Sequence, residues 1–222
     1  MIRKYIFFCA ILMLNCSEKP ATKNQNLKVS EPIKKAEIQS LNSEDFVEID
    51  FKKVAIINKM AYATDSNFLH QKVYPCARAF VRKEVYSAFI KASEIAKTRG
   101  YSLIIYDAYR PISIQRKMYE LVNNPNYVAH PDKGSKHNRG CAVDVGLWKA
   151  NQIVDMGTVF DDFSEKANYH SKSISKSAQE NRKILREIMT QAGFVPYDKE
   201  WWHFNYKKTD YPISDFVWTC GD

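Results

Sequence analysis

Residues 135–148 read Ser-Lys-His-Asn-Arg-Gly-Cys-Ala-Val-Asp-Val-Gly-Leu-Trp, and this stretch decides the fold. Its second half, 141–148, alternates branched apolar residues with small or acidic ones, which predicts a β-strand. Asp144 then shares one strand face with small neighbours. His137 lies in the preceding loop, and a turn at Gly140 could bring its imidazole beside the Asp144 carboxylate. The stretch therefore predicts a strand that carries one half of a candidate metal site.

The segments around this strand mix helical and strand patterns without a regular βαβ repeat. Apolar residues at helical spacing predict three helices, and short β-prone runs predict two more strands. Gly100 and Gly193 are expected to end the first and third helix. This mixture favours an α+β fold with a mainly antiparallel sheet. The expected helices are 84–99, 112–123 and 176–192, the expected strands are 101–106, 141–148 and 201–206, and 124–136 is expected to be a polar loop.

Composition excludes several classes of protein. The chain has 222 residues, of which 45% are apolar, 13% aromatic and 26% charged, so it is neither collagen-like nor wholly disordered. No run of about 18 apolar residues is present, so we expect no ordinary membrane span. The formal net charge is +8, but the basic residues are scattered instead of clustered. We therefore expect no nucleic-acid partner.

Residues 1–16 have the pattern of an export signal. Two basic residues precede an apolar run of about ten residues, as in secretory signals. Cys16 follows Leu-Met-Leu-Asn and resembles the lipidated cysteine of bacterial lipoproteins; ordinary secretion is the alternative. Residues 17–46 are polar and predict a flexible tether, and 47–222 would form the single domain. We expect an exported protein, in the periplasm or at the cell surface, that a lipid on Cys16 anchors to a membrane.

Three cysteines fall within 47–222, so at least one is unpaired. Cys141 belongs to the strand expected to carry site residues. We therefore expect Cys76 to pair with Cys220 in an oxidising compartment. Three free thiols are the alternative.

Two histidines and two acids have the chemistry of a catalytic metal site. His137, Asp144 and His203 would supply two imidazoles and a carboxylate, which suits catalytic zinc with a position left for water. Glu200 lies three residues before His203, where it could take a proton from that water. The alternative is that each residue is structural. No HExxH helix is present, which excludes an ordinary zincin.

The order of these motifs resembles one family. Ser-x-His-x-x-Gly-x-Ala-x-Asp followed by Glu-x-x-His is similar to the zinc peptidases that cut D-amino-acid bonds in peptidoglycan. Further motifs resemble the D-alanyl-D-alanine dipeptidase branch, known from vancomycin resistance. The resemblance implies the α+β, hedgehog-like fold of that family, a central antiparallel sheet flanked by helices. The motifs are Tyr62–Phe68, Tyr106–Pro111, Ser135–Asp144, Met156–Asp161 and Glu200–Phe204.

The resemblance also implies roles at the reaction centre. His137, Asp144 and His203 would bind one zinc ion, and Glu200 would be the catalytic base. Arg110 would stabilise the oxyanion of the tetrahedral intermediate. A salt bridge from Arg110 to a carboxylate such as Asp107 is the alternative.

Three further residues fall at substrate positions of that family. Asp161 would hold the free ammonium of the substrate; a loop carboxylate or helix cap is the alternative. Ser135 and Tyr62 would contact the substrate, with turn and core roles as their alternatives. The sequence departs from the family at two positions. Lys136 replaces the small hydroxyl residue that is usual there, and Cys141 replaces a small residue.

The implied function is zinc-dependent hydrolysis of D-alanyl-D-alanine, or a similar short D-dipeptide, in cell-wall turnover or D-Ala salvage. One alternative is a D,D-carboxypeptidase that trims peptidoglycan stem peptides. A second is a catalytically inactive lipoprotein that binds the cell wall. An ammonium-binding Asp161 favours the dipeptidase, because an endopeptidase has no use for it.

Overall fold

The computed structural model describes residues 45–221. The expected signal with Cys16, and all of the expected tether except its last two residues, lie outside this range. None of the helices in 45–221 is long and apolar enough to cross a membrane. In chain order the elements are β1 (Phe46–Glu48), β2 (Ile56–Asn58), η2 (Ala61–Ala63), β3 (Phe80–Arg82), α1 (Lys83–Thr98), β4 (Ser102–Asp107), α2 (Ile112–Val122), η3 (His137–Arg139), β5 (Ala142–Lys149), β6 (Gln152–Ile153), η4 (Glu165–Ala167), α3 (Lys176–Gln191), β7 (Phe194–Pro196) and β8 (His203–Tyr206).

A six-stranded sheet forms the centre of the fold. Its order is β2-β4-β5-β8-β7, and β6 pairs with β5. Only β2 and β4 run parallel, and the other pairs of this sheet are antiparallel. Strands β1 and β3 form a separate two-stranded sheet. The expected α+β fold with a mainly antiparallel sheet is confirmed.

Strand β5 lies inside this sheet, between β4 and β8. Its residues 142–147 are buried on both faces, so the small residues of the alternating pattern also face protein. Gly146 shows why: a Cβ there would come 2.9 Å from the Tyr106 side chain. The absence of a side chain at Gly146 leaves the space that the Tyr106 side chain occupies.

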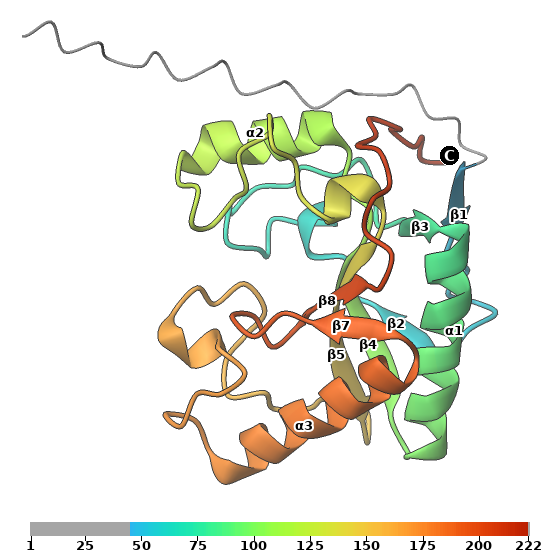
Figure 1. Cartoon of the computed structure of the whole chain (residues 1–222), viewed down its shortest axis with the longest axis vertical. Coiled ribbons are helices and arrows are strands. Elements are labelled where there is room, and N and C mark those ends of the chain that lie inside the picture. Colours follow the sequence, from blue (N-terminus) through green and yellow to red (C-terminus); the bar gives the residue numbers. More distant parts are fainter. Residues whose placement is uncertain (1–44, 222) are drawn as a thin grey trace, which may run out of the picture. The chain divides into compact units, whose positions relative to one another are not determined.

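The helices match their predicted ranges to within one residue. Gly100 follows α1 with φ +77° and Gly193 follows α3 with φ +99°, a conformation that glycine adopts at low cost and that ends a helix. Figure 1 shows α1 and α3 lying along the sheet, whereas α2 lies beyond one end of it.

Three details correct the sequence-based boundaries. Phe46, assigned to the tether, is 6% exposed and pairs with Arg82 in the β1–β3 sheet, so the folded domain begins before residue 47. The expected strand 201–206 begins only at His203, because Trp201 and Trp202 form a turn. The sequence does not predict strands β1, β2, β3, β6 and β7, since two or three residues are too few to show a period of two.

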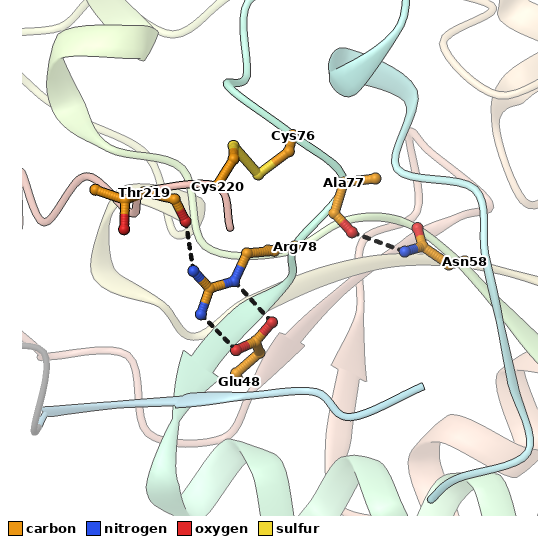
Figure 2. Close-up of a disulfide and its surroundings, with 7 residues drawn as sticks. All are labelled: Glu48, Asn58, Cys76, Ala77, Arg78, Thr219 and Cys220. Carbon is orange, nitrogen blue, oxygen red and sulfur yellow. Dashed lines mark hydrogen bonds and ion pairs between the residues drawn. A yellow bond between two sulfur atoms is a disulfide. The ribbon is translucent and has the colours of Figure 1, made fainter. Parts of the chain in front are cut away.

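The structure joins Cys76 and Cys220 in a disulfide, across a sequence separation of 144 residues. Cys141 is a buried free thiol. Figure 2 shows that Arg78, next to the bridge, donates hydrogen bonds to the Glu48 carboxylate and to the Thr219 carbonyl oxygen. The C-terminal segment is thereby fastened to the β1–β3 side of the molecule.

Candidate active site

Three neighbouring strands place acidic and imidazole side chains in one row. Asp144 on β5 pairs with Asp107 at the end of β4 and with His203 at the start of β8. His137 reaches the same point from η3, the turn that precedes β5. Gly140 ends this turn with φ +69°, which only glycine adopts readily, so the chain can reverse into β5 there.

Three side chains converge on one point. His137 Nε2 lies 3.2 Å from His203 Nδ1 and 3.4 Å from Asp144 Oδ2, and His203 Nδ1 lies 3.0 Å from Asp144 Oδ1. One ligand atom from each residue lies within 4.8 Å of the others. These are the three residues that the sequence predicted to bind a metal.

In each imidazole, the ring nitrogen that points away from the other two ligand residues already forms a hydrogen bond. His137 Nδ1 donates to the Ala108 carbonyl oxygen at 2.7 Å, and His203 Nε2 donates to Asn205 Oδ1 at 3.0 Å. When both imidazoles are neutral, their inner nitrogens present lone pairs toward each other and toward the Asp144 carboxylate. A cation between them, either a proton or a metal ion, relieves this repulsion, and two imidazoles with one carboxylate suit zinc.

The electrostatics of the same residues point the same way. Burial lowers the pKa of His203, but the hydrogen bond and charge of Asp144, the Glu200 charge and the Asn205 hydrogen bond together outweigh burial and raise that pKa to about 9. Burial would raise the pKa of Asp144, but the neighbouring imidazoles lower it below its usual range. The site therefore draws in positive charge, as a proton or as a metal ion.

Glu200 stands beside this group in the turn before β8. Its Oε2 lies 3.8 Å from His203 Nδ1, and its side chain is 29% exposed. Burial raises its pKa above the ordinary glutamate value. Trp201 and Trp202, which follow it, are core residues. The Glu200 carboxylate is thus close enough to the metal-ligand group for one water molecule to bridge the two.

Arg110 follows β4 and is held by two acceptors. Its Nη2 and Nε donate to Asp107 Oδ2 at 2.6 and 3.2 Å, and its Nη1 donates to Gln115 Oε1 at 2.9 Å. The salt bridge considered as the alternative role is therefore present. It does not remove Arg110 from the site, because the guanidinium lines the same cavity as the metal-ligand group.

Asp161 lies across this cavity in the loop after β6. Its Oδ2 accepts a hydrogen bond from the Tyr62 hydroxyl at 2.9 Å. Burial, reinforced by the Asp144 charge, raises the pKa of Asp161 well above its ordinary value. No lysine, arginine or histidine of the described chain forms a salt bridge with it. Asp161 is thus a buried acidic side chain without a salt bridge among the described residues, and a bound cation would stabilise its charged form.

The structure brings every predicted site residue of the domain into one cavity of about 350 Å³. The Ser135 hydroxyl is already engaged within the loop, because it donates to Asn138 Oδ1 at 3.0 Å. Lys136, the departure beside the first histidine, also lines the cavity. The predicted residues found there are Tyr62, Arg110, Ser135, His137, Asp144, Asp161, Glu200 and His203.

The sequence did not reveal the aromatic wall of the cavity. Phe163 stacks on Tyr127 with ring centroids 4.7 Å apart and meets Phe68 edge-on at 5.0 Å. The three rings come from three separate loops, so no local pattern announces them. Asn205 and Gln115 were also missed, although Asn205 lies two residues from His203 on the same strand, which is a usable signal.

A larger cavity of about 1270 Å³ lies beside the smaller one. It shares Phe68 and Asp161 with it and includes none of His137, Asp144, His203 or Glu200. The reactive groups are therefore confined to the smaller cavity.

Comparison with known proteins gives consistent matches. The peptidase M15 family model, described as D-ala-D-ala dipeptidase, matches residues 44–217. A D-alanyl-D-alanine dipeptidase of Escherichia coli is 36% identical over 164 residues, covering 73% of this chain and 85% of that protein. One of Enterococcus faecium is 33% identical over 177 residues, covering 70% and 88%. A solved structure of VanYB in complex with D-alanine-D-alanine is more distant, with 18% identity, a TM-score of 0.39, and coverage of 60% of this chain and 74% of that one.

Proposed function

The chain belongs to the D-alanyl-D-alanine dipeptidase family of peptidases, and on that premise we propose that it hydrolyses D-alanyl-D-alanine or a similar short D-dipeptide. One observation carries the proposal. Asp161, a carboxylate without a cationic partner in the described chain, shares a small cavity with His137, Asp144, His203 and Glu200. A free dipeptide offers what this cavity needs, an ammonium next to a scissile carbonyl.

His137, Asp144 and His203 would hold one zinc ion per chain. Zinc bound there would lower the pKa of a coordinated water toward ~7 and polarise the substrate carbonyl. The protein groups around it have fixed positions: the Ala108 carbonyl and the Asn205 side chain orient the two imidazoles. Such outer partners keep ligands ready for the metal.

Glu200 would move the proton. Its carboxylate accepts a proton from the attacking water and returns that proton to the leaving amine, so the peptide C–N bond breaks and both products leave with their protons balanced. The raised pKa suits this double role, since a stronger base takes the proton more readily. Arg110, fixed by Asp107 and Gln115, would face the negative charge on the carbonyl oxygen.

Asp161 would select for dipeptides. An ammonium at its carboxylate replaces the missing counter-charge, whereas the neutral amide of a longer stem peptide would leave it uncompensated. Asp161 therefore favours a dipeptidase over a D,D-carboxypeptidase. Tyr62 orients the carboxylate through its hydroxyl.

A substrate panel tests the proposal. We expect the zinc-loaded chain to hydrolyse D-Ala-D-Ala, to reject N-acetyl-D-Ala-D-Ala and L-Ala-L-Ala, and to lose activity with a chelator. Glu200→Gln should retain zinc and lose hydrolysis. An inert wild-type chain with bound zinc would instead support a binding protein with an inactive site, and preference for the acetylated peptide would support a carboxypeptidase.

We also propose that the protein is exported and anchored through a lipid on Cys16. The support is the basic and apolar pattern of residues 1–16. An exported enzyme would act outside the cytoplasm, in wall turnover or D-Ala salvage. Membrane fractionation with Cys16→Ser as the comparison tests this: the native chain should be in the membrane fraction and the variant should not. Active protein in the cytosol with residues 1–16 intact would contradict it.

A further inference from the structure

The Cys76–Cys220 disulfide lies outside the cavity, yet each cysteine is two residues from an aromatic ring near the site. Tyr74 precedes Cys76, and Trp218 precedes Cys220. The centroids of these two rings are 5.2 Å apart in an edge-to-face contact, and both side chains are buried. The bridge therefore joins the two chain segments that carry this aromatic pair.

Tyr74 connects the aromatic pair to Arg110. Its hydroxyl donates to Asp107 Oδ1 at 2.6 Å, while Asp107 Oδ2 accepts from Arg110 Nη2 at 2.6 Å. Asp107 is fully buried, and Tyr74 and Arg110 each bind one of its two carboxylate oxygens. The position of the Arg110 guanidinium thus depends on a carboxylate that Tyr74 keeps in place.

The C-terminal segment reaches the site by a second route. The Ser214 carbonyl accepts a hydrogen bond from the Ile112 amide at 3.1 Å, and the Ser214 amide donates to the Asn138 carbonyl at 3.0 Å. The Asn138 side chain in turn donates to the Arg110 carbonyl at 2.8 Å. Because Asn138 follows His137, Ser214 connects the stretch that carries the guanidinium to the stretch that carries a ligand.

Figure 2 shows what else fastens the chain end near the bridge. Arg78 donates to the Thr219 carbonyl and pairs with Glu48, but this pair is well exposed, with side chains 36% and 40% accessible. Exposed ion pairs hold a segment weakly. The covalent S–S bond joins Cys220 directly to Cys76 and is not weakened by solvent, so it holds this segment more firmly.

We propose that the Cys76–Cys220 disulfide is a positioning element of the active site. It holds Trp218 against Tyr74 and Ser214 between α2 and η3, and reducing it lowers catalytic turnover. The inference rests on the proposed hydrolysis. A phosphine reductant breaks the S–S bond, two thiols form with two protons from water, and the phosphine leaves as its oxide.

The test compares the oxidised and phosphine-reduced full chain on D-Ala-D-Ala at a temperature where both stay folded. A phosphine is chosen because dithiols bind zinc, and zinc content is measured in each sample. We expect reduction to lower kcat roughly tenfold, with a smaller change in KM and with zinc retained. The double variant Cys76→Ser/Cys220→Ser should have the low kcat and no response to the reductant. The control Glu48→Gln should keep both the basal turnover and the response.

Hydrogen exchange gives a readout that does not need activity. The Ile112 and Ser214 amides, protected by the hydrogen bonds above, should exchange faster after reduction. Unchanged kcat after reduction, or peptide mapping without a Cys76–Cys220 link, overturns the proposal. If even the oxidised chain hydrolyses no dipeptide, the proposed function fails; faster exchange would then still support the bracing, and unchanged exchange would overturn it.

Discussion

Asp107→Asn exchanges one oxygen for an amide nitrogen inside a buried ion pair. Arg110 donates to this carboxylate at 2.6 and 3.2 Å, and the two side chains are 9% and 0% exposed. The variant leaves the guanidinium buried without a counter-charge, which costs about 3–5 kcal/mol of unfolding free energy. Against a total of roughly 5–15 kcal/mol for a domain, this is a large share. At about 2–4 °C per kcal/mol, the Tm should fall by about 6–20 °C.

Glu48→Gln is the matched control. The Arg78–Glu48 pair also has two hydrogen bonds, at 2.8 and 2.6 Å, but its side chains are 36% and 40% exposed. Exposed pairs contribute about 0.2–1 kcal/mol, so its Tm should fall by less than about 4 °C. Urea denaturation and thermal melts at pH 7 in one buffer measure both variants. If Asp107→Asn costs no more than Glu48→Gln, burial is not what makes the Asp107 pair important, and the reasoning is refuted.

Four further predictions concern the proposed reaction. Glu200→Gln should lower kcat by about 10²–10⁴ with zinc content unchanged, as amine release and metal analysis would measure, and retained turnover would exclude it as the base. Because burial raises the pKa of Glu200 and a base acts when deprotonated, activity should decline on acidification already above the ordinary glutamate range; a decline only within that range would contradict this. Metal removal by a chelator should abolish hydrolysis and lower the Tm, and added zinc should reverse both effects. His203→Ala should have the same two effects, and added zinc should not reverse them. Asp161→Asn should lower kcat/KM for the dipeptide yet raise the Tm at pH 7. The buried Asp161 carboxyl has a raised pKa, so the folded wild-type protein holds more protons than the unfolded one, and its stability falls as the pH rises above the ordinary aspartate pKa. The Tm gain of the variant should therefore vanish near pH 4. A gain that does not depend on pH would contradict this role of the Asp161 charge.

The helices and the central strands were predictable because their signals are local. Gly100 and Gly193 end helices α1 and α3 where the spacing predicted, and the alternating residue types of 141–148 correctly predicted a strand there, β5. The short strands were not predictable, since three residues show no period. The sequence places Phe46 in the tether because the residues just before it are polar, whereas its partners in β3 lie far along the chain.

The candidate site divides in the same way. Residue type and spacing, together with the family resemblance shown by the order of the motifs, identified four site residues: His137, Asp144, Glu200 and His203. The aromatic wall was not, because Phe68, Tyr127 and Phe163 meet only through three loops. For Arg110, the sequence offered an oxyanion role and a salt bridge as alternatives. The structure contains the salt bridge and still places the guanidinium in the cavity.

The sequence by itself determined which residues carry the candidate chemistry and which segments are helix or strand, because periodicity and turn residues act over a few positions. Only the tertiary structure decided that these residues meet. Asp144 faces His203 because β5 and β8 pair in one register, and a slip of one residue would turn the carboxylate to the other face of the sheet. The contacts of Tyr74 with Trp218 and Asp107, and the bridge across 144 residues, likewise depend on packing between distant segments, which no local pattern encodes.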